Sequence, residues 1–433
     1  MITKNIKSNF SRSKEAINAF WIIVCRIARM VVSFLISILT ARYLGPSNFG
    51  LINYATAYVT FFTSLCTLGI NGVIIKDFLN YPKEQGSAIG TSILFRSISS
   101  SLSVIIIVVI VSILDRGDGL TIGVAFLCSL ALIFQSMDTI NYWFQSKYLS
   151  KVGAVAGLIG YTISSIFKVG LFVCNASVLF FAFSTSIDYI IEAMILYFSY
   201  KHNNGPKLII NFSIGKRLIS QSYHYILSGM MVAIYGQVDR LMLKQMLNES
   251  AVGYYSLAAS INMMWVFVLQ AVIDSMYPTI LKLYNIDRKA FERKNMQLYS
   301  VVIYLSAFIS IMFILFGRIA IVLLYGEVYL PSANVLNVIT WYTIFSYLGV
   351  ARNAWLICEN KQKYLKYIYV VAVFLNIVLN YFFIGWMGTY GAALASLITQ
   401  IGTSIVIPLF IPALRPNLKL IFGGILLRGF KKA

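Results

Sequence analysis

Two arginines stand three residues apart inside an apolar run near the start of the chain. If this run spans a bilayer, the charged groups of Arg26 and Arg29 should face a protein interior or water rather than lipid. A guanidinium binds phosphate oxygens through parallel N–H···O bonds and is only weakly hydrated. Together with Arg96 and Lys168 in later apolar runs, the pair predicts a binding site for a phosphate or pyrophosphate group.

The competing interpretation is that these cations serve the protein itself. Asp138 and Glu192 also lie within apolar runs and could form internal ion pairs with them. Spacing along single helices does not decide between the two uses, so both interpretations stay open at this point.

Uncharged polar residues recur at helical spacing in the same runs. Separations of three, four and seven residues place such side chains on one face of a helix. They are Ser33, Ser37, Asn53, Thr60 and Thr63 in the first half, and Gln221, Ser228 and Tyr235 in the second. These stripes predict a polar cavity; the alternative is that the hydroxyls only pack helices together or bond to their own backbone.

Side chains that could ligate a metal or form disulfides are scarce. The chain has five cysteines without a CxxC pair and two histidines, His202 and His224. A structural zinc site needs four such ligands close together. The sequence therefore predicts no metal, no cofactor and no catalytic residue.

The elements that must position these residues are membrane-spanning helices. Of the 433 residues, 59% are apolar and 12% are charged, against roughly 25% charged in a soluble domain. The apolar runs reach the ~20 residues that a helix needs to cross the bilayer core. They cover 16–39, 50–75, 88–114, 119–142, 152–174 and 177–199, and then 219–245, 251–281, 297–324, 333–352, 365–385 and 390–411. We expect an all-α polytopic membrane protein of about 12 transmembrane helices.

The basic residues indicate the orientation of these helices. The net charge is +20, and most Lys and Arg fall in loops that a cytoplasmic N-terminus would place in the cytoplasm. An even number of spans then puts both termini there. The C-terminal stretch 412–433 is predicted to form a basic amphipathic tail that lies on the inner leaflet. A nucleic-acid site is disfavoured because the basic residues are scattered over separate loops instead of forming one patch.

A weak internal repeat predicts two lobes. Residues 44–55 align with residues 247–258 at an offset of 203, with Leu, Ser, Gly and Ala coinciding. The offset joins spans that are six apart, so the two halves have the same orientation and a pseudo-twofold axis along the membrane normal. We expect six-helix lobes at 1–200 and 219–411, joined by a cytoplasmic loop at 201–218.

Four stretches resemble a known family. The segment Ala41–Gly50, ARYLGPSNFG, looks like the N-terminal signature of bacterial polysaccharide exporters, and the likeness continues at Asp239–Gly253, Leu324–Tyr329 and Gly391–Ala395. The chain is thus similar over nearly its whole length to flippases of lipid-linked oligosaccharides. These flippases belong to the multidrug/oligosaccharidyl-lipid/polysaccharide exporter superfamily.

The resemblance implies a specific cargo and direction. Such a flippase carries an undecaprenyl-pyrophosphate-linked oligosaccharide repeat unit, for O-antigen or capsule, from the inner to the outer leaflet of the bacterial inner (plasma) membrane. Transport would proceed by alternating access, and Asp239, Asp274 and His224 are the groups that could couple it to a proton or sodium gradient. A polysaccharide polymerase complex is the protein partner that such a carrier would serve.

Other functions predict other features. A multidrug or small-solute exporter of the same superfamily should prefer anionic cavity walls, and a polymerase or ligase should need a large outer loop. A structural scaffold would not require polar-lined lobes. A peptidoglycan-precursor flippase is the nearest rival, because it also carries a pyrophosphate-linked lipid, although such proteins usually have more than twelve spans.

Overall fold

The computed structural model describes the backbone of residues 2–430 and the side chains of residues 21–226 and 229–430. Within this part of the chain every regular element is helical, which confirms the all-α prediction. The earlier helices are α1 (Ile2–Cys66), α2 (Ile74–Asn80), α3 (Gln85–Leu114), α4 (Gly119–Ser129), α5 (Ala131–Phe134), α6 (Asp138–Ser146), α7 (Ser150–Val173), α8 (Val178–His202) and α9 (Phe212–Met246). The later helices are α10 (Glu249–Met263), α11 (Val266–Tyr284), α12 (Arg288–Tyr325), α13 (Pro331–Cys358), α14 (Leu365–Ile401), α15 (Ile407–Phe410) and α16 (Arg415–Ile425).

Many of these helices are membrane spans by length and composition. Among the described residues, 8 helices pass both tests, or up to 9 when the bent pair within α9 is included. The two longest candidates, Trp21–Cys66 and Gln362–Phe410, contain kinks at Gly45 (φ 68°) and Gly388 (φ 61°), backbone conformations that suit glycine. Each of them therefore covers two expected spans. The protein is a multi-pass membrane protein, and about twelve spans remains the expected number.

Some expected spans are subdivided in the structure. The helix through 50–75 ends at Cys66, because Gly69 adopts a left-handed conformation (φ 61°) before α2 begins. The run 119–142 folds as three successive helices, α4, α5 and α6. The run 251–281 folds as α10 and α11, separated at 264–265. Apolar periodicity does not register such breaks, because residues on both sides of them stay buried or lipid-facing.

Contacts divide the chain into two compact units. The first comprises residues 1–44 and 51–233, and the second comprises residues 45–50 and 234–433. The division falls inside α9, later than the loop at 201–218 that the sequence suggested. Residues 201–233 thus contact the first unit, for reasons given with the Arg217 cluster below.

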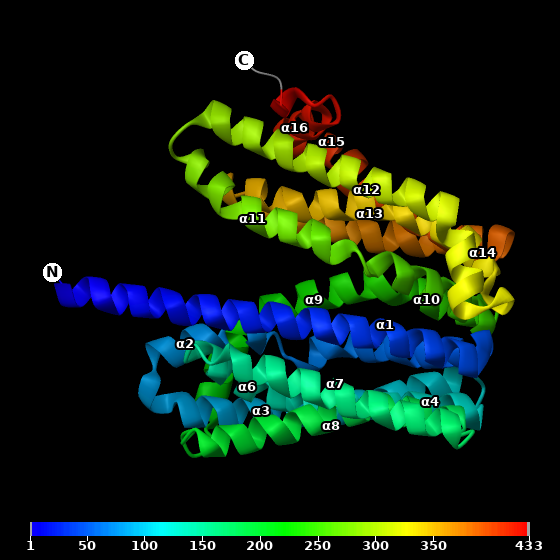
Figure 1. The fold of residues 1–433 in the computed structure, drawn as a ribbon, viewed down its shortest axis with the longest axis horizontal. Coiled ribbons are helices and arrows are strands. Elements are labelled where there is room, and N and C mark those ends of the chain that lie inside the picture. The colour runs from blue at the N-terminus through cyan, green and yellow to red at the C-terminus, as the bar shows by residue number, and fades with distance from the viewer. Residues whose placement is uncertain (1, 431–433) are drawn as a thin grey trace. The chain divides into compact units, whose positions relative to one another are not determined.

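The first unit is built around pairs of antiparallel helices. In Figure 1, α7 and α8 run side by side, and α4 and α5 also pack on α8. At one end of the unit, Trp143 and Phe144 of α6 are buried with Ile74 and Phe78 of α2. The Trp143 indole N–H donates to Gln85 Oε1 at 3.1 Å, so this buried polar group is satisfied.

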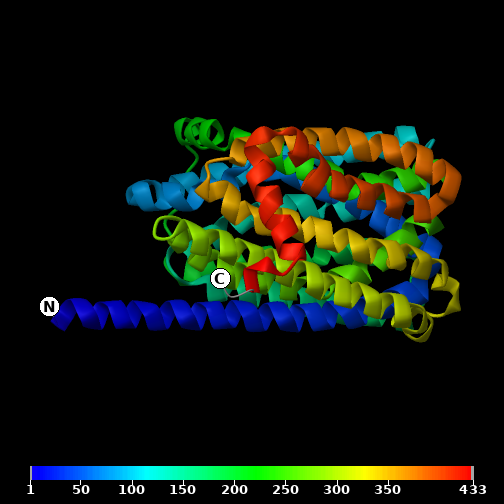
Figure 2. The same ribbon diagram turned by 90° about the horizontal axis from the view of Figure 1, so that it is seen from above.

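The second unit packs α12 against α13, with the C-terminal helix on top of them. Figure 2 shows α16 (red) crossing α12 (yellow-green) steeply. The crossing is close because a Cβ on Gly423 would lie 2.6 Å from Met296 Sδ, and one on Gly424 would lie 2.9 Å from Tyr299 Cβ. Ser300 Oγ donates to the Gly424 carbonyl at 2.7 Å. The tail predicted at 412–433 is thus packed on the unit through residue 430, and its location at the inner leaflet remains a prediction.

The two segments of the internal repeat contact each other within the second unit. A Cβ on Gly50 would lie 1.8 Å from the Glu249 carbonyl oxygen, and one on Gly253 would lie 2.1 Å from the Pro46 carbonyl oxygen. At the offset of 203, Gly50 corresponds to Gly253 and Pro46 to Glu249. The contact is therefore reciprocal, as a local twofold axis requires, and only glycine fits at either position.

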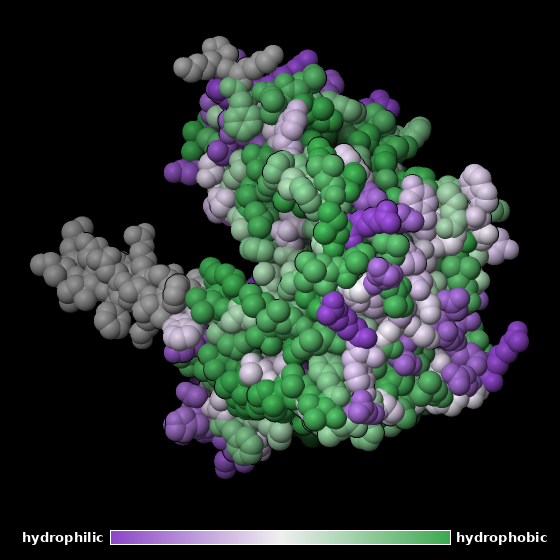
Figure 3. Space-filling view, turned by 45° about the vertical axis from the view of Figure 1, so that its right-hand side comes forward, coloured by the Kyte–Doolittle hydropathy of each residue, from purple (hydrophilic) through white to green (hydrophobic). Residues whose placement is uncertain are grey.

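The surface carries large apolar side chains. Trp386 and Phe410 are each 80% exposed, and hydrophobic residues (green) dominate much of the face seen in Figure 3. Exposed apolar area on this scale marks a surface that contacts lipid or another protein, not water.

Candidate functional site

The first unit contains a cluster of charged side chains centred on Arg29. The Arg29 Nη2 lies 2.8 Å from Asp188 Oδ2, which joins α1 to α8. The Arg29 side chain is 38% exposed, whereas that of Asp188 is 10% exposed. One partner of this ion pair is thus reachable from outside the cluster, and the other is held inside it.

An aromatic ring brings Lys168 into the same cluster. The Arg29 guanidinium carbon lies 5.1 Å from the centroid of the Tyr161 ring, and Lys168 Nζ lies 6.0 Å from it. Cations over an aromatic face are attracted by its quadrupole. Tyr161 and Lys168 are seven residues apart on α7, so both project from one face of that helix.

Two further carboxylates lie around Arg29. Glu192 is one turn beyond Asp188 on α8, and a Cβ on Gly157 would lie 3.2 Å from Arg29 Nη1 and 3.3 Å from Glu192 Oε1. Asp138 of α6 is close enough for its charge to interact with Arg29 and with Arg96. The internal partner of Arg29 is therefore an acidic residue, as one of the two sequence interpretations held, but the residue in contact is Asp188 rather than Asp138 or Glu192.

Arg96 is positioned separately from Arg29. Its side chain is 2% exposed and donates to Thr139 Oγ1 at 2.9 Å and to the Gln135 carbonyl at 2.8 Å. These bonds join α3 to Gln135, between α5 and α6, and to the first turn of α6. Among the described residues no direct contact joins Arg96 to Arg29 or Lys168, and a phosphate-binding role for Arg96 stays a prediction.

Arg26 lies one helical turn before Arg29 on α1, but among the described residues no contact joins it to Asp188 or Tyr161. It is exposed, three residues before Arg29, and no charged partner is recorded for it among the described side chains. Of the four cations predicted to hold a phosphate, the structure thus brings together Arg29 and Lys168.

The polar stripe of the second predicted span is bonded to its own backbone. Thr60 Oγ1 donates to the Thr56 carbonyl at 2.9 Å, and Thr63 Oγ1 donates to the Val59 carbonyl at 2.7 Å. Ser33, Ser37 and Asn53 are half-buried. The hydroxyls of Thr60 and Thr63 thus bond to the backbone of their own helix, which was the alternative to lining a cavity. A cavity-lining role stays a prediction for all five residues.

The second-half members of the stripe are dispersed. Gln221 is exposed and Tyr235 is half-buried, with its hydroxyl enclosed and without a hydrogen bond among the described atoms. The side chain of Ser228 lies outside the described residues.

The second unit contains a buried carboxylate surrounded by neutral donors. Asp239 of α9 is 4% exposed and accepts hydrogen bonds from Asn380 Nδ2 at 2.7 Å, from Ser396 Oγ at 2.5 Å and from the Tyr255 hydroxyl. Asn380 also donates to Asn376 Oδ1 at 3.1 Å. Three helices meet at this carboxylate, because Tyr255 belongs to α10 and the other partners belong to α14.

The kink of α14 makes this arrangement possible. Asn380 precedes Gly388 and Ser396 follows it, so the two halves of α14 approach Asp239 from different directions. The next residue, Arg240, points elsewhere, as adjacent helical residues must, and its Nε donates to Ser256 Oγ at 3.0 Å.

The other two residues predicted to couple transport have partners of their own. Asp274 of α11 is exposed and accepts from Gln270 Nε2 of its own helix at 2.8 Å. His224 belongs to the first unit, is exposed, and packs its ring against that of Tyr223 at 3.7 Å between centroids.

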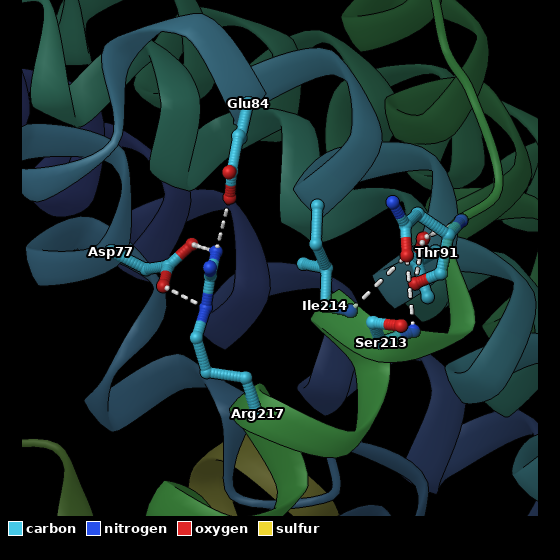
Figure 4. A network of polar contacts seen from close by, with 7 residues as sticks. Asp77, Glu84, Thr91, Ser213, Ile214 and Arg217 are labelled. Atoms are coloured by element: carbon cyan, nitrogen blue, oxygen red, sulfur yellow. Dashed lines mark hydrogen bonds and ion pairs between the residues drawn. The ribbon is translucent and has the colours of Figure 1, made fainter.

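A third polar cluster fastens the start of α9 to the first unit. Arg217 Nη2 donates to Asp77 Oδ2 at 3.1 Å and to Glu84 Oε2 at 2.8 Å, as Figure 4 shows, and its guanidinium lies 4.1 Å from the centre of the Tyr81 ring. The Asp77 side chain is 2% exposed. Burial raises the pKa of Asp77 above its ordinary value, although the charge and hydrogen bond of Arg217 act to lower it.

The segment before α9 is bound along α3. Thr91 Oγ1 accepts from the Asn211 N–H at 2.8 Å and donates to the Asn211 carbonyl at 3.3 Å. Ile209 N–H donates to the Gly86 carbonyl at 3.4 Å, and the backbone approaches closely because Gly86 has no side chain. This attachment explains why the unit boundary falls inside α9.

Sequence reasoning missed several residues of these clusters. Asp188 has a signal, since Asp188 and Glu192 form an i, i+4 acidic pair inside an apolar run. Asn376 and Asn380 show the same spacing with amides. Tyr255 and Ser396 carry no such signal, because isolated hydroxyls are common in spans.

Comparison with known proteins places these clusters in a family context. Residues 39–334 match the family described as polysaccharide biosynthesis protein. A capsular polysaccharide biosynthesis protein, CapF, of Staphylococcus aureus is 22% identical over 395 residues, which cover 88% of this chain and 96% of that protein.

Solved transporter structures share the fold. The lipid II flippase MurJ in an inward closed conformation matches with a TM-score of 0.69 and 15% identity, covering 93% of this chain and 91% of MurJ. An inward-facing multidrug resistance MATE family transporter of the MOP superfamily matches with a TM-score of 0.61 and 12% identity, covering 92% of this chain and 94% of that one. The match of the family over more than half of the sequence, on a fold shared with these transporters, confirms the resemblance: the chain belongs to the polysaccharide biosynthesis protein family.

Proposed function

We propose that this protein is a flippase that moves an undecaprenyl-pyrophosphate-linked oligosaccharide repeat unit from the inner to the outer leaflet of the bacterial plasma membrane. The assembled polymer would be capsule or O-antigen, and both termini would lie in the cytoplasm. The transport is physically necessary, because the hydroxyls of a sugar chain each cost kilocalories in hydrocarbon.

The observation that carries the proposal is the convergence of Arg29 and Lys168 on Tyr161 in a member of this family. Two cations and an aromatic ring on neighbouring helices can bind the phosphates and stack on the first sugar of such a lipid. Because Arg29 is 38% exposed, its remaining N–H donors are reachable without unfolding the unit.

Asp239 is the group best placed to couple the cycle to a cation gradient. Its carboxylate is buried and satisfied by neutral donors from α10 and α14, so a proton or a hard cation would change which groups it holds. The oxygens of Asn376, Asn380 and Ser396 are the ligand type that hard cations prefer. Asp274 and His224 keep their predicted coupling role as secondary candidates, since Asp274 bonds to Gln270 of its own helix and His224 packs on Tyr223.

The proposed function predicts a specific accumulation in cells. Deletion of the gene in its host should abolish the surface polymer and leave single lipid-linked repeat units on the inner leaflet, measured by extraction of the undecaprenyl-linked pool. A plasmid copy should restore the polymer. Unchanged polymer in a strain without a redundant carrier would contradict the proposal and favour a small-solute exporter, whereas arrest of cell-wall synthesis would favour the peptidoglycan precursor as cargo.

The two arginines of α1 provide a matched pair for the phosphate role. Arg29→Ala should lower surface polymer at least tenfold at equal protein abundance, because it removes a charge-assisted contact to the cargo of about 1.5–3 kcal/mol. Arg26→Ala should have a clearly smaller effect, since Arg26 lies outside the cluster. Equal effects of the two substitutions would show that position on α1, rather than the Tyr161 cluster, decides binding.

A further inference from the structure

The ion pair between Arg29 and Asp188 uses only one of the two carboxylate oxygens of Asp188. Asp188 contacts the guanidinium through Oδ2 at 2.8 Å, while its Oδ1 is buried without a hydrogen bond among the described atoms. The pair is therefore not the two-bond arrangement that makes arginine–carboxylate pairs strongest. A phosphate group, which offers more oxygens, can contact more of the guanidinium than Asp188 does.

The surroundings of Asp188 allow its carboxylate to leave Arg29. Lys168 lies close enough for its charge to interact with Asp188, so a second cation is at hand. A Cβ on Gly160 would lie 3.2 Å from Asp188 Oδ1, so α7 packs closely beside the carboxylate and only a residue without a side chain fits there. The displaced acid thus keeps a counter-charge within the same cluster.

Carboxylates offset the cations of the cluster when cargo is absent. Asp138, Asp188 and Glu192 oppose the charge of Arg29, and Asp188 also opposes that of Lys168. A cluster that contains carboxylates binds an anion less tightly than a purely cationic one. Weak binding suits a carrier, because cargo held too tightly on one side of the membrane is not released on the other.

We propose that Asp188 is a positioning residue that occupies the phosphate site of Arg29 in the empty protein and is displaced by the phosphate of the cargo. Return of the carboxylate to Arg29 then helps to expel the cargo after translocation. This inference rests on the proposed function, and it adds a named competitor and a release step to it.

The test uses the full chain in lipid nanodiscs, with inorganic pyrophosphate as the probe and calorimetry as the readout. Asp188→Ala removes the occupant, and Asp188→Asn keeps its shape but not its charge. The Kd for pyrophosphate should fall about tenfold in Asp188→Ala, the factor expected for loss of one competing charge-assisted hydrogen bond, and by a smaller factor in Asp188→Asn. An unchanged Kd in both variants overturns the inference.

Glu192→Gln is the matched control. It removes one negative charge from the same face of α8 but leaves the Arg29–Asp188 contact in place, so the Kd should change less than about threefold. A gain equal to that of Asp188→Ala would mean that general electrostatics, not occupancy of Arg29, sets the affinity, and the inference would be wrong.

The Arg29→Ala variant distinguishes failure of the displacement step from failure of the proposed phosphate-binding role. Loss of pyrophosphate binding in Arg29→Ala together with an unchanged Kd in Asp188→Ala refutes the displacement step alone. Wild-type binding in Arg29→Ala refutes the phosphate role of the cluster itself.

Transport kinetics supply a readout that a purely structural role would not move. In proteoliposomes loaded with a lipid-linked oligosaccharide, Asp188→Ala should lower KM and kcat together, because cargo binds more tightly and leaves more slowly. A fall in kcat with an unchanged or higher KM, at an unaltered melting temperature, contradicts the release step.

Discussion

The charged cluster of the first unit and the polar network of the second solve the problem of burying charge in opposite ways. Arg29 and Asp188 form an ion pair with one exposed partner and additional charges nearby. Asp239 is a single buried carboxylate that neutral donors from two helices, α10 and α14, satisfy. An exchangeable ion pair suits a charged cargo, whereas a carboxylate ringed by amides and hydroxyls suits a small cation or a proton.

The largest expected difference between the two regions is in stability. Asp239→Ala leaves three buried donors without an acceptor, each of which costs about 1–3 kcal/mol. Asp188→Ala removes the ion-pair partner of Arg29 and a nearby opposite charge of Lys168, but the Arg29 side chain is 38% exposed and can be hydrated. The melting temperature in detergent should therefore fall by several degrees for Asp239→Ala and by much less for Asp188→Ala. Equal losses would break the distinction between the two regions.

The Arg217 cluster extends this comparison to Asp77, an acid that is more deeply buried than Asp188. Arg217→Gln leaves the Asp77 charge buried without its cation, so we expect a loss of about 1–3 kcal/mol in stability at neutral pH. Asp77→Asn combined with Arg217→Gln should recover most of this loss, because the uncompensated charge is gone. Thermal melts of the single and double variants measure both effects, and a double variant no better than Arg217→Gln would contradict this explanation.

The pH dependence of the Arg217→Gln defect follows from the same burial. The folded-state pKa of Asp77 is raised above its unfolded value, so the folded unit binds the proton more tightly than the unfolded chain does. The penalty from Asp77 is therefore full above the folded pKa and disappears as the pH falls below the unfolded pKa. The gap in melting temperature between Arg217→Gln and wild type should narrow on acidification, and a gap that widens would contradict the assignment.

A smaller effect is expected where a glycine provides room for Arg29. Gly157→Ala places a Cβ 3.2 Å from Arg29 Nη1 and 3.3 Å from Glu192 Oε1, so pyrophosphate binding should weaken a few-fold with little change in melting temperature. Gly170→Ala on the same helix is the control, because a Cβ there meets nothing within 4 Å. Equal binding in the two variants would indicate that the guanidinium does not depend on this space.

The smallest effect should come from the threonine stripe. Thr63→Val removes a hydroxyl that bonds only to the Val59 carbonyl of its own helix, so stability should change by less than about 0.5 kcal/mol and transport should be retained. A marked loss of surface polymer would instead support the predicted cavity-lining role of Thr63.

Sequence patterns predicted the elements of this molecule better than their contacts. Apolar runs identify the helices, since the bilayer fixes their length and hydropathy. The kinks at Gly45 and Gly388 fall in the gaps between expected spans, at 40–49 and 386–389. The choice of Asp188 over Asp138 or Glu192 as the partner of Arg29 was out of reach, because it depends on how α1, α6 and α8 pack. The same holds for Asp239, whose partners lie up to 157 residues away in the chain.

The attachment of residues 206–217 to α2 and α3 has a consequence for fragment experiments. If the peptide bond between Asn203 and Asn204 is cut, the C-terminal piece still carries Ile209 and Asn211, which bond to Gly86 and Thr91, and the guanidinium that Asp77 and Glu84 bind. The two pieces should therefore copurify after nicking or after coexpression from separate genes. We therefore expect an intact chain at this point to be dispensable for keeping the start of α9 bound to the first unit.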